Sequence, residues 1–221
     1  MKTLTRSRLG AWARVAAIAV ASQAIAMAGN IAITDPSFEA TGTFAFLSGG
    51  NWTITQGSAA NAAPDSGQFP GGAPNGTKIA TLGGGLSGSN IFQSLSVTVD
   101  ANSTYTLSFD VGIPTGGTAY SFSAFLIAGG VFLHSTQSVP TIAPGTFGLA
   151  SFTFDTSDTF NAFAVGNSLA IDINQTDTTH DGYFDNVTLT EVSNAAPEPT
   201  SMFLLFGGIP AVVGFAKLRR K

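Results

Sequence analysis

Hydrophobic and polar residues alternate with a period of two along much of the chain between residues 30 and 194. In YTLSFDV, the apolar side chains of Tyr105, Leu107, Phe109 and Val111 alternate with Thr, Ser and Asp. Successive side chains of a β-strand point to opposite faces of the sheet, so this pattern predicts a strand with one buried face. No helical periodicity of useful length occurs in this region. We therefore expect an all-β domain.

Further segments show the same alternation and are separated by turn-forming residues. The segments that predict strands are residues 94–99, 119–127, 147–154, 168–173 and 183–190. Clusters of Gly, Pro, Asn and Asp such as NAAPDSGQFPGGAPNG and PTGG lie between them. Many short strands with such breaks are typical of an antiparallel sandwich or barrel.

The start of the chain has the pattern of a secretory signal peptide. Small residues at Ala24, Ala26 and Ala28 follow an Ala-, Val- and Ile-rich run, and this order predicts a signal peptide over residues 1–28. The basic residues ahead of the run are Lys2, Arg6, Arg8 and Arg14. Cleavage is expected after Ala26 or Ala28. The alternative is an amphipathic helix of the mature protein.

The end of the chain carries a short apolar segment, Met202–Ala216, followed by basic residues. As a helix it would extend about 22 Å, less than the roughly 30 Å hydrocarbon core of a bilayer. Glycines and Pro210 weaken that helix further. The four terminal cations would keep the tail on the cytoplasmic side, so we expect a marginal transmembrane segment rather than a buried core helix.

Residues 195–221 resemble the PEP-CTERM sorting signal of Gram-negative bacteria. The triplet Pro197, Glu198 and Pro199 matches its namesake motif, and the apolar segment and basic cluster complete the pattern. The resemblance implies recognition by an exosortase-type membrane protease. It also implies export through the inner membrane, a transient anchor at 202–216, and delivery to a cell surface or extracellular matrix associated with exopolysaccharide.

Charge and cysteine content exclude several classes of function. The formal net charge is −4, but eight of the nine basic residues lie within the first 14 or the last five positions. Between residues 30 and 196, Lys78 is the one basic residue against twelve carboxylates, which gives a formal charge of 1 − 12 = −11. Nucleic-acid binding requires clustered cations and is not expected. The absence of cysteine excludes disulfides and thiolate metal sites.

Residues 29–194 resemble the jelly-roll sandwiches of the galactose-binding-like superfamily, which includes many carbohydrate-binding modules. The segments that carry this resemblance are ITDPSFEA, then NWTIT, then NSTYTLSFDV, and finally DGYFDNVTLTEV. The resemblance implies an antiparallel jelly-roll β-sandwich, flanked here by the signal peptide and a short C-terminal apolar helix.

The same resemblance implies a structural calcium site. Alternation places Tyr183, Asp185, Val187 and Leu189 on one face, which puts a carboxylate among core-facing residues. In the related fold, an acid near the first strand and one in the last strand help to hold calcium, and Glu39 and Asp185 occupy those places. Carboxylates are suitable calcium ligands. The alternative is that Asp185 caps a turn or meets solvent at a sheet edge.

Other motifs give no support for catalysis. The acidic segment DINQTDTTHD, residues 172–181, lacks the glycine and glutamate of an EF-hand, and a solvated loop is the favoured interpretation. GGGLSG, residues 83–88, precedes a predicted strand instead of the helix that a dinucleotide site needs. There is no G-x-S-x-G motif, and His134 and His180 are the only histidine bases. We therefore expect no enzymatic activity.

Trp52 is the first candidate as a ligand platform, with Tyr120 and then Tyr183 behind it, because sugars stack on flat aromatic faces; core packing is the alternative for Trp52. The leading hypothesis is an exported, non-enzymatic surface or matrix protein that binds carbohydrate weakly. One alternative is a structural or adhesive matrix component that self-associates through sheet edges. A further alternative is a glycoside-active enzyme with two converging carboxylates.

Overall fold

The computed structural model describes residues 28–46, 50–83 and 88–194 of the 221-residue chain, and these residues form two β-sheets. The strands of the first half are β1 (Ala28–Ile31), β2 (Phe44–Phe46), β3 (Trp52–Gln56), β4 (Ala59–Ala62), β5 (Ile79–Leu82), β6 (Ser89–Thr98) and β7 (Ser103–Ile113). Those of the second half are β8 (Phe122–Ala128), β9 (Val131–Phe132), β10 (Thr136–Ser138), β11 (Thr146–Asp155), β12 (Ser168–Gln175) and β13 (Gly182–Ser193). The single helical turn among these residues is the 3₁₀ turn η1, Ala162–Ala164.

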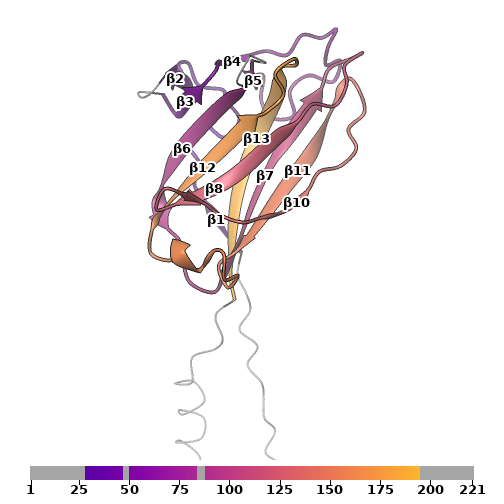
Figure 1. Cartoon of the computed structure of the whole chain (residues 1–221). Coiled ribbons are helices and arrows are strands. Elements are labelled where there is room, and N and C mark those ends of the chain that lie inside the picture. The colour runs from indigo at the N-terminus through magenta and orange to yellow at the C-terminus, as the bar shows by residue number, and fades with distance from the viewer. Residues whose placement is uncertain (1–27, 47–49, 84–87, 195–221) are drawn as a thin grey trace, which may run out of the picture. The chain divides into compact units, whose positions relative to one another are not determined.

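The two sheets are built mainly from antiparallel strands. Sheet A has the order β10-β11-β7-β13-β5-β4, with β1 also paired to β13, and sheet B has the order β2-β3-β6-β12-β8-β9. The parallel pair among the described strands is β2 with β3. Figure 1 shows the sheets as two layers. The prediction of an all-β, antiparallel sandwich is therefore confirmed, and each of the six segments with alternating residues contains a strand.

The core lies between the inner faces of the two sheets. Phe109 of β7, Phe122 of β8 and Phe184 of β13 contact one another edge to face, with ring centroids 5.8 to 6.0 Å apart. Alternation explains this packing, because Tyr105, Leu107, Phe109 and Val111 all point inward from β7. These aromatic contacts add to the stabilisation that burial itself provides.

The predicted face of the last strand is wrong for Tyr183 and Asp185, which lie on the outer face of sheet A. Phe184, Val187 and Leu189 belong to the core, whereas Asp185 opposes Asp110 on the outer face of sheet A. A β-bulge between Asp185 and Thr188 inserts one residue into β13, since three steps on β13 match two on β7. Asn186 in this bulge has φ of 53°. An inserted residue reverses the alternation, which is why Asp185 and Val187 do not share a face.

Several predicted segments lie outside the described residues. They are nearly all of the signal peptide over residues 1–28, the sorting motif Pro197, Glu198 and Pro199, and the apolar segment Met202–Ala216. Within the described part of the chain, no helix has the length and hydrophobicity needed to cross a membrane.

Candidate functional site

Trp52, the first predicted ligand platform, lies in the core between the sheets. Its side chain is fully buried, its ring lies 5.4 Å from the ring of Phe38, and its indole N–H donates to the Asp35 carbonyl oxygen at 3.1 Å. The polar atom of the indole is thus satisfied inside the protein. Trp52 presents no face to a ligand, so its position corresponds to the core-packing alternative.

Tyr120, the second predicted ligand residue, is also buried, and its hydroxyl joins the segment before β8 to strand β13. The hydroxyl donates to the Tyr183 carbonyl oxygen at 3.1 Å and accepts from the Tyr183 backbone N–H at 2.8 Å. Burial raises the pKa of Tyr120 well above its ordinary value. The ring, but not the hydroxyl, is therefore available to a ligand.

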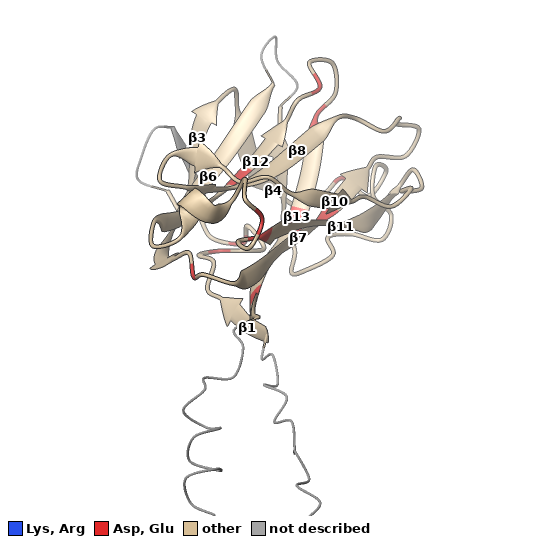
Figure 2. Cartoon of the chain, turned by 60° about the horizontal axis from the view of Figure 1, so that its bottom comes forward, with Lys and Arg blue, Asp and Glu red and all other residues tan. Residues whose placement is uncertain are grey.

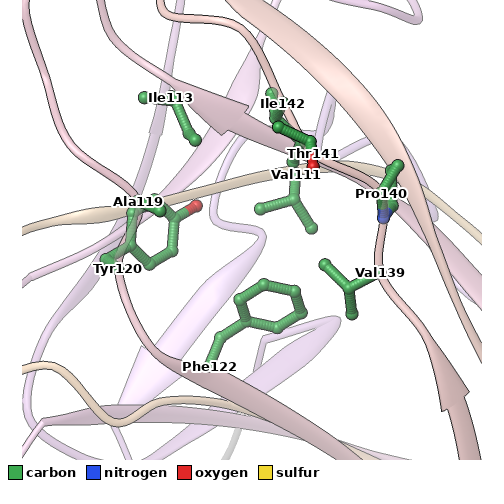
Figure 3. Close-up of a pocket in the computed structure, with 9 residues that line it drawn as sticks. All are labelled: Val111, Ile113, Ala119, Tyr120, Phe122, Val139, Pro140, Thr141 and Ile142. Atoms are coloured by element: carbon green, nitrogen blue, oxygen red, sulfur yellow. The ribbon is translucent and has the colours of Figure 1, made fainter.

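The Tyr120 ring lines an apolar cavity of about 280 Å³ at the edge of the sandwich. Figure 3 shows the Tyr120 and Phe122 rings facing Val139 and Pro140 across this space, with Val111 between them. Tyr120 is the only titratable residue in the lining. The cavity could hold a small apolar group, but it offers no acid or base that works near neutral pH.

Glu39, one of the two predicted calcium ligands, anchors the loop at residues 75–78. Its Oε1 accepts the backbone N–H groups of Thr77 and Lys78, both at 2.7 Å, and these bonds, that of Lys78 first, lower the pKa of Glu39. The Lys78 ammonium donates to the Glu39 carbonyl oxygen at 2.7 Å. Gly76 has φ of 76°, and a Cβ there would lie 2.4 Å from Glu39 Oε1, so the close approach of the loop depends on glycine.

Asp185, the other predicted calcium ligand, holds the same loop at its first residue, Asn75. It is fully buried; Oδ2 accepts the Asn75 N–H at 2.8 Å and Oδ1 accepts the Asn186 N–H at 2.7 Å. Burial raises the pKa of Asp185 to about 6, and the negative charges of Asp110 and Glu39 add to the rise. Among the described residues, no three His, Asp or Glu side chains gather as a metal cluster. Calcium binding by Glu39 and Asp185 stays a prediction.

A groove of about 580 Å³ lies beside this carboxyl on the outer face of sheet A. Asp110 of β7 and Phe147 of β11 form part of its wall, together with the loop segments 70–74 and 144–146. Phe69 covers the same face, with its ring 4.7 Å from Phe147 and 5.0 Å from Tyr183. A Cβ at Gly112 would lie 2.6 to 2.8 Å from the Phe147 and Phe69 rings, so glycine is needed for this aromatic cover.

Asp110 and Asp185 form a carboxyl pair at the groove. They are direct partners across β7 and β13, and the Asn186 amide donates to Asp110 Oδ2 at 3.2 Å. Asp110 borders the groove, while Asp185 lies behind it under the loop. Sequence reasoning missed Asp110. The available signal was a carboxylate in the long alternating strand YTLSFDV, but its partner became visible only with the pairing of β7 and β13.

The acidic segment 172–181 divides into two parts. Asp172 belongs to strand β12, whereas Asp177 and His180 lie in the following loop, with His180 Nδ1 3.0 Å from Asp177 Oδ2. The hydroxyl and backbone N–H of Thr179 lower the pKa of Asp177 to about 2. The loop part is mostly solvent-exposed, in agreement with the solvated-loop interpretation.

Several solved structures similar to this chain are cyclases. A Stig cyclase, Fisc from Fischerella sp. TAU, in complex with (3Z)-3-(1-methyl-2-pyrrolidinylidene)-3H-indole, is 21% identical and matches with a TM-score of 0.58 over 75% of this chain and 98% of that chain. A cyclase from Fischerella sp. TAU in complex with 4-(1H-indol-3-yl)butan-2-one is 21% identical. It matches with a TM-score of 0.58 over 76% of this chain and 100% of that chain. An apo cyclase from Fischerella sp. is 20% identical. It matches with a TM-score of 0.59 over 74% of this chain and 96% of that chain. These likenesses show a common fold. No curated protein matches the chain.

The family comparison overturns the expectation of a non-enzymatic protein. The family model described as HpiC1-like, HpiC1 cyclase, matches residues 29–190, which is most of the chain. The hypotheses of a weak carbohydrate-binding surface protein and of a purely structural matrix component are therefore wrong, and so is the prediction of no enzymatic activity. Sequence reasoning found no short catalytic motif in the chain and therefore gave no sign of an enzyme. The chain belongs to the HpiC1-like family of cyclases.

Proposed function

We propose that the protein is a cyclase that closes a ring in a small, mainly apolar, unsaturated substrate bound in the groove on sheet A. The observation that carries this proposal is the carboxyl pair, in which Asp185, with a pKa of about 6, lies behind Asp110 at the groove wall. The groove volume of about 580 Å³ lies within the range of small-molecule sites, roughly 300–1,000 Å³.

Ring closure without change of composition needs little more than a proton and a fixed geometry. Proton transfer to an unsaturated substrate makes a neighbouring carbon electron-poor, a π-electron pair of the same molecule forms the new ring bond, and loss of a proton restores neutrality. A carboxyl with a pKa near the working pH suits both transfers. Holding the substrate folded removes much of the entropic cost of closure.

Each part of the site has a role in this scheme. Asp110, which borders the groove, gives the proton to the substrate and later takes one back, and Asp185, buried behind it, is the second carboxyl of the pair that holds the shared proton. Phe147 and the prolines of loop 70–74 provide apolar walls. Indoles with an unsaturated side chain are our proposed substrate class, because two similar cyclases were crystallised with indole compounds.

The test is product formation from such indoles, followed by chiral chromatography and NMR for a product of unchanged mass. Asp110→Asn and Asp185→Asn should each lower kcat/KM by about 10²- to 10⁴-fold, the usual contribution of general acid–base catalysis. Asp100→Asn is the matched control, because Asp100 is exposed between β6 and β7, and this variant should retain the full rate. Full activity in both pair variants would contradict the proposal.

Export and sorting remain proposals alongside the enzymatic function. We expect residues 1–28 to be removed, and Pro197, Glu198 and Pro199 to direct processing by an exosortase-type protease, which frees the jelly-roll domain from residues 202–216. N-terminal sequencing and intact mass of protein from the cell surface test both steps. An N-terminus at Met1 together with an intact C-terminus would contradict them.

Calcium binding is an alternative proposal for Glu39 and Asp185, because a carboxylate bound to calcium would not also hold the proton. A cation bound by the native state alone raises the melting temperature, so calcium should stabilise the protein and a chelator should reverse the effect. Asp185→Asn should abolish this stabilisation. An unchanged melting temperature at saturating calcium would remove both residues from a metal site.

A further inference from the structure

A second buried carboxyl, Asp172, lies on the opposite sheet and takes no part in the proposed mechanism. It sits on β12, in the interior of sheet B, directly opposite Phe92 of β6 on one side and Phe125 of β8 on the other. Directly opposed residues of antiparallel strands share a face, so the three side chains form one row. Leu169, Ile171 and Ile173 point into the core, which places this row on the outer face.

Asp172 is only 6% exposed, yet one of its oxygens has no partner in the described part of the structure. The Asn90 side-chain amide donates to Oδ1 at 2.7 Å. Oδ2 accepts no hydrogen bond from a described residue, and a small part of its surface stays accessible. Burial raises the pKa of Asp172, so the ionised carboxyl is poorly compensated. A buried anion of this kind favours a bound counter-charge.

Two partly exposed aromatic rings flank this carboxyl. Phe92 and Phe125 lie outside the hydrophobic core, and the Phe125 ring is 4.9 Å from that of Phe132, which is 56% exposed. The electron-rich face of a phenyl ring attracts cations, and the attraction strengthens when water is excluded. Aromatic rings on both sides of a carboxylate are therefore complementary to an organic cation.

The described residues supply no cation to this site. Lys78 is the only basic residue between positions 30 and 196, and its ammonium binds the Glu39 carbonyl oxygen on sheet A. Figure 2 shows acidic residues across the fold, one of them on β12, between the uncharged strands β6 and β8. With a formal charge of −11 over residues 30–196, the domain attracts small cations.

We propose that the outer face of sheet B binds a small organic cation of the primary alkyl- or arylammonium class. The ammonium group donates to Asp172 Oδ2, and its carbon substituents pack between Phe92 and Phe125. Asn90 holds the carboxylate in place through Oδ1. This site is separate from the groove on sheet A, and it does not depend on the cyclase proposal.

Benzylammonium and its uncharged analogue benzyl alcohol are the probes. In titrations of the full domain followed by calorimetry and NMR, benzylammonium should bind, and benzyl alcohol should bind at least about tenfold more weakly because it lacks the charge. Asp172→Asn should weaken benzylammonium binding by about tenfold or more. It keeps the size of the side chain and an oxygen that accepts from Asn90, so the fold should survive.

Two further variants keep the test decisive. Phe125→Leu should weaken benzylammonium binding by about threefold through loss of the aromatic face, and Asp100→Asn should leave it unchanged. Shifts in the NMR signals of Phe92 and Phe125 should accompany binding even if a variant is unstable. Equal binding of both probes, or unchanged affinity in Asp172→Asn, would overturn the proposal. So would loss of binding in Asp185→Asn alone, which would assign the cation to the groove.

Discussion

Asp185 and Asp172 are two buried carboxyls on the outward faces of the two sheets, and they are held in different ways. Burial is the main cause of the raised pKa of each. Asp185 accepts two backbone N–H groups beneath a covering loop. Asp172 accepts one side-chain amide on a face flanked by aromatic rings.

The difference shows that neighbouring groups determine whether a buried carboxyl favours holding a proton or binding a cation. Hydrogen bonds to a carboxylate lower its pKa, yet the pKa of Asp185 reaches about 6, because burial and the charges of Asp110 and Glu39 outweigh two such bonds. That balance favours holding a proton. Asp172 has no charged neighbour contributing to its pKa shift. Its surroundings favour an external cation instead.

The largest effect in this comparison should come from the loop that covers Asp185. Gly76→Ala places a Cβ 2.4 Å from Glu39 Oε1 at a residue with φ of 76°. Strain of this kind costs about 1–3 kcal/mol, so the free energy of unfolding should fall by about that amount. Chemical denaturation measures the change.

Gly71→Ala is the matched control in the same loop. A Cβ at Gly71 would meet nothing within 4 Å, and its φ is not positive. Its stability should stay within about 0.5 kcal/mol of the parent. Equal losses in Gly76→Ala and Gly71→Ala would show that the close approach to Glu39 is not what fixes the loop.

A smaller effect should appear in the dependence of stability on pH. The pKa of Asp185 is about 6 in the folded protein, above its ordinary value of 3.8, so between these pH values the folded state binds more protons than the unfolded state. The free energy of unfolding contributed by this group therefore falls as pH rises from about 4 to about 6. Asp185→Asn should remove that decline.

Asp172→Asn is the comparison variant for the dependence of the free energy of unfolding on pH. The pKa of Asp172 is also raised, so its contribution has the same sign, but this variant should keep the part of the decline that Asp185 causes. Denaturation midpoints at several pH values between 4 and 8 separate the two. Parallel curves for the parent and Asp185→Asn would contradict the raised pKa of Asp185.

The strands were predictable because burial of one face imposes a period of two. Segments such as 105–111 and 147–154 bury one face against the other sheet, and the alternation records that directly. Trp52 was predicted as a ligand platform with core packing as the alternative, and it lies in the core, where it packs on Phe38 and its N–H donates to a carbonyl oxygen. Local pattern sufficed wherever a residue's environment follows from its own strand.

The site was not predictable, because it depends on register between distant strands. Asp110 and Asp185 meet only because β7 pairs with β13. The bulge after Asp185 reverses the alternation that placed this residue among core positions, and nothing in the hydrophobic pattern reveals an inserted residue. The row of Phe92, Asp172 and Phe125 likewise requires the pairing of β6, β12 and β8.

The smallest expected effect on stability distinguishes the side-chain amide that donates to Asp172 from the backbone N–H that donates to Asp185. Asn90→Ala removes the amide that donates to Asp172, whereas Asn75→Ala leaves the backbone N–H that donates to Asp185. Loss of one hydrogen bond to a buried carboxylate costs about 1–2 kcal/mol, so Asn90→Ala should be destabilised by that amount at pH 8, and Asn75→Ala by less than about 0.5 kcal/mol. The pKa of Asp172 should also rise further in Asn90→Ala, because the Asn90 bond lowers it. Carboxyl NMR titration and denaturation measure both effects, and equal losses in the two variants would mean that the two carboxyls are not held by different kinds of donor.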